Sequence, residues 1–70
     1  MTRDEWIREF AEALGTEAPD SATVDELLDL AAVAAHASER TAAPIACYLA
    51  GRDGRPIGDL KDLADGVGGD

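Results

Sequence analysis

The side chains best suited to chemistry are a single histidine, His36, and a single cysteine, Cys47. A metal site would need further ligands one helical turn from His36. Position 32 is alanine and position 40 is arginine, so only Glu39, three residues on, could join it. A nucleophilic site would need a base and an orienting group beside Cys47 or a serine, and no spacing supplies them. We therefore expect no catalytic site, no metal and no cofactor.

Carboxylates dominate the surface chemistry, with 15 acids against six bases and a net charge of −9. Residues 1–39 carry ten acids and two bases, a balance of −8, whereas residues 40–70 carry five acids and four bases, a balance of −1. Negative charge repels the phosphate backbone, the main source of nucleic-acid affinity. We therefore exclude nucleic acid as a partner and interpret most carboxylates as a solvated face.

Three arginines in the less acidic half form a candidate anion patch: Arg40, Arg52 and Arg55. Arginine suits bidentate contacts to phosphate or carboxylate groups. No glycine-rich phosphate loop accompanies them. Charge balance on an acidic domain is the alternative interpretation, and it is the one that we favour.

The elements that must position these side chains are helices. Thr2 and Glu5 have the spacing of a capping box, which predicts a first helix over residues 3–14 that ends before Gly15. At 100° per residue its apolar side chains share one face, opposite its charges. That face consists of Trp6, Ile7, Phe10 and Leu14.

A second helix is predicted to begin at Thr23, with a capping box to Glu26, and to end between Ser38 and Arg40. Its apolar stripe spans roughly 200° and is rich in alanine, more than one neighbour can cover. We therefore expect this helix at the centre of the fold, in contact with neighbours on two sides.

A third helix is predicted over residues 42–50, capped by Thr41 and closed by Gly51, and a short fourth over residues 58–65. On the third helix, one face is predicted to carry Ile45, Tyr48 and Leu49. On the fourth, the residues predicted to point inward are Leu60, Leu63 and Ala64, with Ile57 and Val67 as flanking contacts. The sequence thus predicts one all-α domain over residues 1–70: a small antiparallel bundle of three main helices plus a short C-terminal fourth, with a frayed tail at 66–70.

A chain of 70 residues buries only about 60% of its unfolded surface, so its core is marginal. Cys47 is the only cysteine and cannot form an internal disulfide. We therefore expect a protein partner or a second copy to add stability. Trp6 and Tyr48 are either core residues or interface anchors, and with His36 and Arg40 they are the candidate contact residues.

No apolar run is long enough for a membrane span, and the two acids directly after Arg3 argue against a signal peptide. We therefore expect a cytoplasmic chain without a membrane partner.

Two segments carry a resemblance to a known family. The first is the run from Val24 to Ala31, and the second contains the His-x-x-Glu-Arg and Ala-Ala-Pro elements between His36 and Pro44. With the Trp6 segment upstream and Tyr48 to Gly51 downstream, the chain resembles a small actinobacterial domain of unknown function. That family also occurs fused to nucleotidyltransferases similar to molybdopterin-guanine dinucleotide synthases. The resemblance implies an accessory role near molybdenum cofactor assembly and supplies no catalytic residues.

A second resemblance is to acyl carrier proteins, which are also acidic, four-helical and similar in length. Asp20-Ser21-Ala22 stands where carriers have Asp-Ser-Leu, which would make Ser21 the attachment point of the prosthetic group. Ala22 replaces the leucine, and the loop from Gly15 to Thr23 is shorter than the first loop of carriers. The carrier function is therefore the minor alternative.

Overall fold

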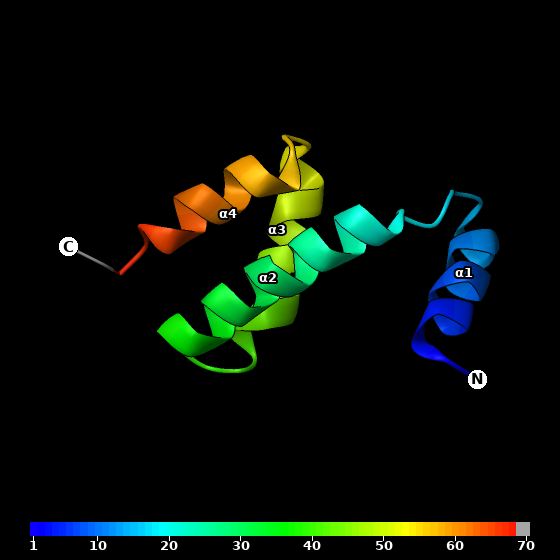
Figure 1. Cartoon of the computed structure of the whole chain (residues 1–70), viewed down its shortest axis with the longest axis horizontal. Coiled ribbons are helices and arrows are strands. Elements are labelled where there is room, and N and C mark those ends of the chain that lie inside the picture. Colours follow the sequence, from blue (N-terminus) through cyan, green and yellow to red (C-terminus); the bar gives the residue numbers. More distant parts are fainter. Residues whose placement is uncertain (69–70) are drawn as a thin grey trace.

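The computed structural model describes residues 1–68, which form four helices and no strand. α1 spans Arg3–Leu14, α2 spans Ser21–Ala37, α3 spans Ala42–Asp53 and α4 spans Ile57–Asp65. The predicted all-α fold class, with three longer helices and a short fourth, is confirmed (Figure 1). The predicted frayed tail begins at Gly66, which caps α4, and its last two residues, 69–70, lie outside the described residues.

α1 has the bounds and the caps that the sequence predicts. The Thr2 hydroxyl accepts a hydrogen bond from the Glu5 amide at 3.1 Å, and the Glu5 carboxylate accepts one from the Thr2 amide at 3.3 Å. Gly15 adopts a left-handed conformation with φ of 77°, which glycine tolerates without strain. The capping box and the C-terminal glycine therefore define this helix without help from its neighbours.

α2 begins two residues earlier than predicted, at Ser21. Asp20 is the N-cap, and its carboxylate accepts a hydrogen bond from the Thr23 amide at 2.8 Å. Thr23, predicted as the cap with a box to Glu26, lies inside the first turn instead. Aspartate and threonine are both good caps, and Asp20 satisfies an amide that a later start would leave to the solvent.

α3 and α4 each extend beyond their predicted bounds. Gly51 lies inside α3, which continues to Asp53 and ends at Gly54, where φ is 85°. A glycine inside a helix costs about 1 kcal/mol relative to alanine, which the surrounding helix tolerates. Thr41 flanks α3 in a helical conformation and makes no side-chain cap. α4 begins at Ile57, one residue early, directly after Pro56.

α2 is the central helix, as predicted, with α3 packed against it on one side and α4 on another (Figure 1). The buried core consists of Leu30 of α2, Ala50 of α3 and Leu60 of α4, with Ile57 and Ala64 packed around it. The other two apolar side chains predicted to pack from this end of the chain, Leu63 and Val67, are largely exposed. The expectation that they point inward was wrong because α4 presents only one narrow face to α2.

α1 lies beside the N-terminal end of α2 and makes no interface comparable to those of α3 and α4 (Figure 1). The molecule is accordingly elongated, 41 Å along its longest axis and 18 Å along its shortest. None of the helices in residues 1–68 combines the length and hydrophobicity that crossing a membrane requires. The packed unit is therefore α2, α3 and α4, with the apolar face of α1 left uncovered.

Candidate functional site: an apolar groove

The orientation of α3 creates the most distinctive surface of this protein. Its small residues face the packed side, where Ala43, Ala46 and Cys47 are partly buried and Ala50 is fully buried. Small side chains let α3 approach the alanine-rich α2 closely. The opposite face of α3 carries its large apolar side chains, which the sequence predicted to share one face: Ile45 (60% exposed), Tyr48 (62%) and Leu49 (55%). This face is exposed, so these side chains are available for contacts.

A groove of about 730 Å³ opens between the C-terminal part of α2, the first half of α3 and the end of α4. Its lining is mostly apolar and comes from three segments: Val33, Ala34, Ala37, Ser38 and Glu39; Thr41, Ala42, Ile45, Ala46 and Leu49; and Ala64, Val67 and Gly68. Ser38 donates its hydroxyl to the Ala34 carbonyl at 2.8 Å, so this donor is already used. The groove therefore suits an apolar occupant.

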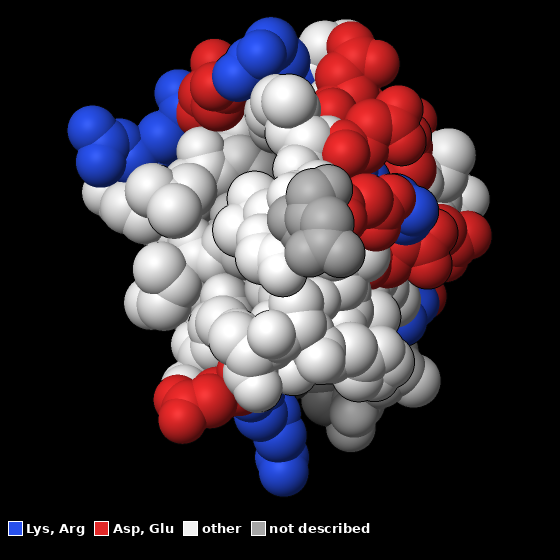
Figure 2. Space-filling view, turned by 90° about the vertical axis from the view of Figure 1, so that its left-hand side faces the viewer, with Lys and Arg blue, Asp and Glu red and all other residues white. Residues whose placement is uncertain are grey.

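Figure 2 looks at the end of the molecule where α2 and α4 finish, and a broad area without charged side chains fills the middle of this view. Lysine, arginine and acidic side chains lie around its margin. An apolar surface bordered by charges is typical of a site that another molecule covers.

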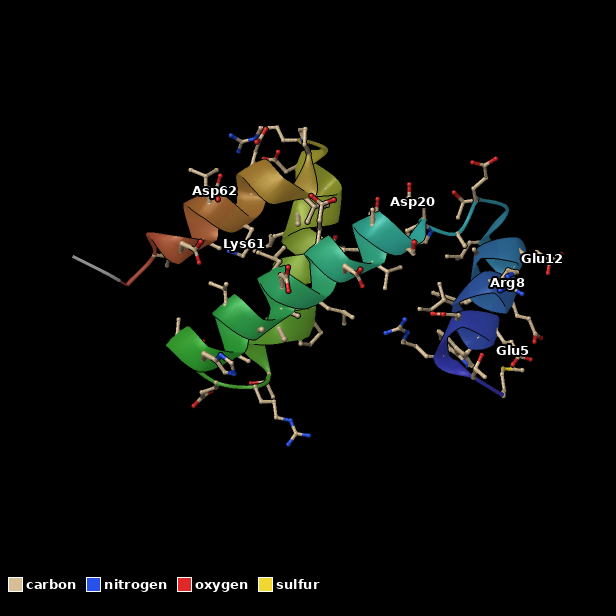
Figure 3. All side chains as sticks on the ribbon, viewed as in Figure 1. Glu5, Arg8, Glu12, Asp20, Lys61 and Asp62 are labelled. Carbon is tan, nitrogen blue, oxygen red and sulfur yellow. The ribbon has the colours of Figure 1, made fainter. Side chains whose placement is uncertain are left out.

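α1 presents a second uncovered apolar surface, which we call the α1 ridge: Trp6, Phe10 and Leu14. The Trp6 and Phe10 rings stack with their centroids 5.2 Å apart. Both rings are at least half exposed, and Leu14 is 62% exposed. Figure 3 shows Glu5, Arg8 and Glu12 on the side of α1 that faces away from the other helices. The helix is thus amphipathic, and the three ridge side chains stay exposed although Ala11 is buried and Ile7 is partly buried.

The four candidate contact residues are all exposed, but they do not form one cluster. Trp6 belongs to the α1 ridge, His36 lies in the last turn of α2, and Arg40 lies between α2 and α3. Tyr48 lies beside the groove on the outer face of α3, with the Arg52 guanidinium 5.6 Å from its ring centroid. Sequence reasoning left Trp6 and Tyr48 open as core residues or interface anchors, and both are exposed in the structure. It missed the groove itself.

The three arginines of the candidate anion patch have separate surroundings. Arg55 makes a bidentate ion pair with Asp53, at 2.7 and 2.9 Å, which lowers the pKa of that carboxyl to about 2. Arg52 lies over Tyr48. Arg40 precedes Arg52 by 12 residues, roughly 18 Å at the rise of a helix. The structure therefore does not bring them around one anion.

The Cys47 thiol faces α2 and is half-buried, as the sequence suggested. Its Sγ lies 3.8 Å from the Leu27 carbonyl oxygen and donates a weak hydrogen bond to it. Burial raises the pKa of the thiol above its ordinary value, which lowers the share of the reactive thiolate. Within residues 1–68, no three histidine, cysteine or acidic side chains come together as metal ligands do.

Ser21, the attachment point in the carrier interpretation, is the first residue of α2 and is exposed. The neighbouring Asp20 carboxylate accepts the Thr23 amide, and this hydrogen bond lowers the pKa of Asp20. The Asp20-Ser21 pair is therefore accounted for as a helix start.

The fold and this surface define a class of protein: a small all-α domain that carries an open apolar groove and a separate amphipathic helix. A family model described as a domain of unknown function (DUF6457) matches residues 1–54, and the chain belongs to that family. No curated protein and no solved structure matches it. The matched residues include α1, α2 and α3, so α1 is part of the family's domain, whereas α4 lies outside the match.

Proposed function

We propose that this chain is a non-catalytic protein-interaction module that binds an amphipathic helix in its apolar groove. The observation that carries the proposal is the outward orientation of Ile45 and Leu49, which line the groove and are each more than half exposed. Leaving such side chains in water forfeits about 1 kcal/mol or more apiece, which an occupant would recover. Grooves of this kind commonly take one face of a helix.

The groove offers an occupant little polar chemistry, which supports binding rather than catalysis. At the one nucleophile near the packed interface, the Cys47 thiol, burial lowers the share of the reactive thiolate. We place the protein in the cytoplasm and its process near molybdenum cofactor assembly. The second statement rests on the resemblance of the Val24–Ala31 and His36–Pro44 segments to a domain fused to cofactor nucleotidyltransferases.

The test compares capture of proteins from a native lysate by the wild-type chain and by two matched variants. Leu49→Glu places a charge in the groove, whereas Leu28→Glu places the same charge on α2 outside it, at a leucine of similar exposure (49% against 55%). We expect a defined protein to bind wild type and Leu28→Glu but not Leu49→Glu. A nucleotidyltransferase-like protein among the captured species would support the proposed process. Equal capture by all three baits, or no capture and no self-association, would exclude the proposed function.

A further inference from the structure

We propose that the occupant of the groove is the α1 ridge of a second copy of this chain, so that two copies exchange their first helices reciprocally. The inference rests on the proposed function and names the partner of the same groove. In a two-fold dimer each copy would give one ridge and receive one, which closes the assembly.

The first line of support is position, because α1 lies beside the N-terminal end of α2 whereas the groove lies at its C-terminal end (Figure 1). Gly15 and Thr16 are tied back to α1 by hydrogen bonds from their amides, at 3.0 and 2.9 Å, and Asp20 is tied to α2 as its cap. Only residues 17–19 remain free between the helices. They join Thr16 to Asp20 through four Cα–Cα steps, which span about 14 Å at most, and the separation of two packed helix axes takes 8–10 Å of that span.

A fold-back of α1 along α2 would therefore start level with Ser21. At about 1.5 Å per residue, the 12 residues of α1 would end near Val33, with Trp6 opposite Asp29. The groove begins at Val33 and extends past the end of α2 to Ala42 and Val67. With the helix ends level, the ridge falls short of its own groove, whereas the ridge of another copy has no such tether.

The second line of support is charge. Residues 1–20, which include the ridge, carry six acids and two bases, a balance of −4. Residues 40–56, which include the outer face of α3, carry three arginines and one aspartate, a balance of +2. Glu39 lines the groove and Arg55 is paired with Asp53, so Arg40 and Arg52 are the cations that can attract the acidic α1.

The third line of support is area. The ridge and the outer surface of the groove contribute seven exposed side chains per copy: Trp6, Phe10, Leu14, Ile45, Tyr48, Leu49 and Val67. At roughly 100 Å² each, counted in both copies, they give about 1,400 Å². Stable interfaces bury about 1,200–2,000 Å² in total. Two reciprocal contacts are therefore sufficient for a dimer, whereas one alone is small.

The test is complementation between two defective chains, followed by sedimentation velocity over a wide concentration range. Phe10→Glu damages the ridge and Leu49→Glu damages the groove. Each residue is at least half exposed in the single chain, so helicity should persist in both variants. We expect wild type to dimerise, and each variant alone to associate on the order of 100-fold more weakly, a loss of about 2.7 kcal/mol. An equimolar mixture should associate more tightly than either variant alone but more weakly than wild type, because it restores one of the two ridge–groove pairs.

Leu28→Glu is the matched control and should dimerise like wild type. Trp6 is the only tryptophan, so its emission should shift to shorter wavelength on dimerisation and remain unshifted in Leu49→Glu. A monomeric wild type at every concentration, or a mixture that associates no more tightly than either variant alone, overturns the inference. Loss of lysate capture in Leu49→Glu would then still support the proposed function. A monomer whose Trp6 emission responds to Leu28→Glu would instead show that α1 covers α2 in its own chain.

Discussion

The orientation of α3 can be tested by exchanging residue sizes at two adjacent positions. Leu49 is 55% exposed on the outer face of α3, whereas Ala50 is 5% exposed against α2. We consider Leu49→Ala, which removes a large side chain from the groove, and Ala50→Leu, which forces one into the packed interface. The orientation in the structure predicts that the variant with the larger side chain is the less stable one.

The magnitudes follow from burial. Full burial of a leucine contributes about 1.5–3 kcal/mol, and less than half of Leu49 is buried, so Leu49→Ala should cost less than about 1.5 kcal/mol. The higher helix propensity of alanine offsets part of that cost. Overpacking a buried position costs about 1–3 kcal/mol. Since 1 kcal/mol shifts Tm by about 4–8 °C in a domain of this size, Ala50→Leu should lower Tm by roughly 5–20 °C.

Thermal unfolding followed by far-UV circular dichroism gives the comparison. Both substitutions should be made in the Phe10→Glu background, where association contributes least to the measured Tm. We expect Leu49→Ala to remain within a few degrees of that background and Ala50→Leu to lie well below it. If Leu49→Ala had the lower Tm, the large face of α3 would be the buried one, and the groove would not exist as described.

Three further predictions concern single groups. The pKa of Asp20 is lowered by the Thr23 amide, so the stabilisation of α2 by this carboxylate is complete above the unfolded pKa of about 3.9 and is lost as pH falls through the lower folded value. In an acid titration, the helicity of Asp20→Asn should therefore depend less on pH than that of wild type. An unchanged profile would contradict this cap. Arg55 lowers the pKa of Asp53 to about 2, so Arg55→Ala should raise it towards the ordinary range in an NMR titration, and an unchanged value would refute the ion pair. Burial raises the pKa of the Cys47 thiol, so the folded chain should react with DTNB more slowly than the urea-unfolded chain at the same pH, and equal rates would show an accessible thiolate.

Local signals in the sequence were sufficient for much of the fold. The Thr2–Glu5 capping box and Gly15 define α1 because the hydrogen-bonding groups of the backbone at both helix ends find partners within a few positions of the sequence. The start of α2 was misplaced because Asp20 and Thr23 are both competent caps, and only the completed hydrogen bond distinguishes them. The end of α3 was placed too early, at Gly51, for a similar reason. A helix tolerates one internal glycine, and Gly54, which adopts the left-handed conformation, is the glycine that caps this helix.

The groove could not be predicted because α3 has two apolar faces. Periodicity makes two faces of α3 plausible as the inner one: the face with the large side chains of Ile45 and Leu49, and the face with the small side chains of Ala43 and Ala50. Hydrophobicity alone favours the face with the larger side chains. The structure selects the smaller set, since the alanine-rich α2 allows a close approach that large side chains would prevent. The signal available in the sequence was this pairing of alanine-rich faces on two consecutive helices. Which face of α3 stays exposed depends on how α3 packs against α2, and tertiary packing of this kind is not encoded in local sequence signals.

The most direct measurement of the central claim is an isotope-filtered NOE experiment on a mixture of labelled and unlabelled chains. The reciprocal exchange predicts cross-peaks between the aromatic protons of Trp6 and Phe10 in one copy and the methyl groups of Ile45 and Leu49 in the other. Aromatic protons that contact only methyl groups of their own chain, such as those of Leu28, would contradict it, as would the absence of intermolecular peaks at the highest attainable concentration.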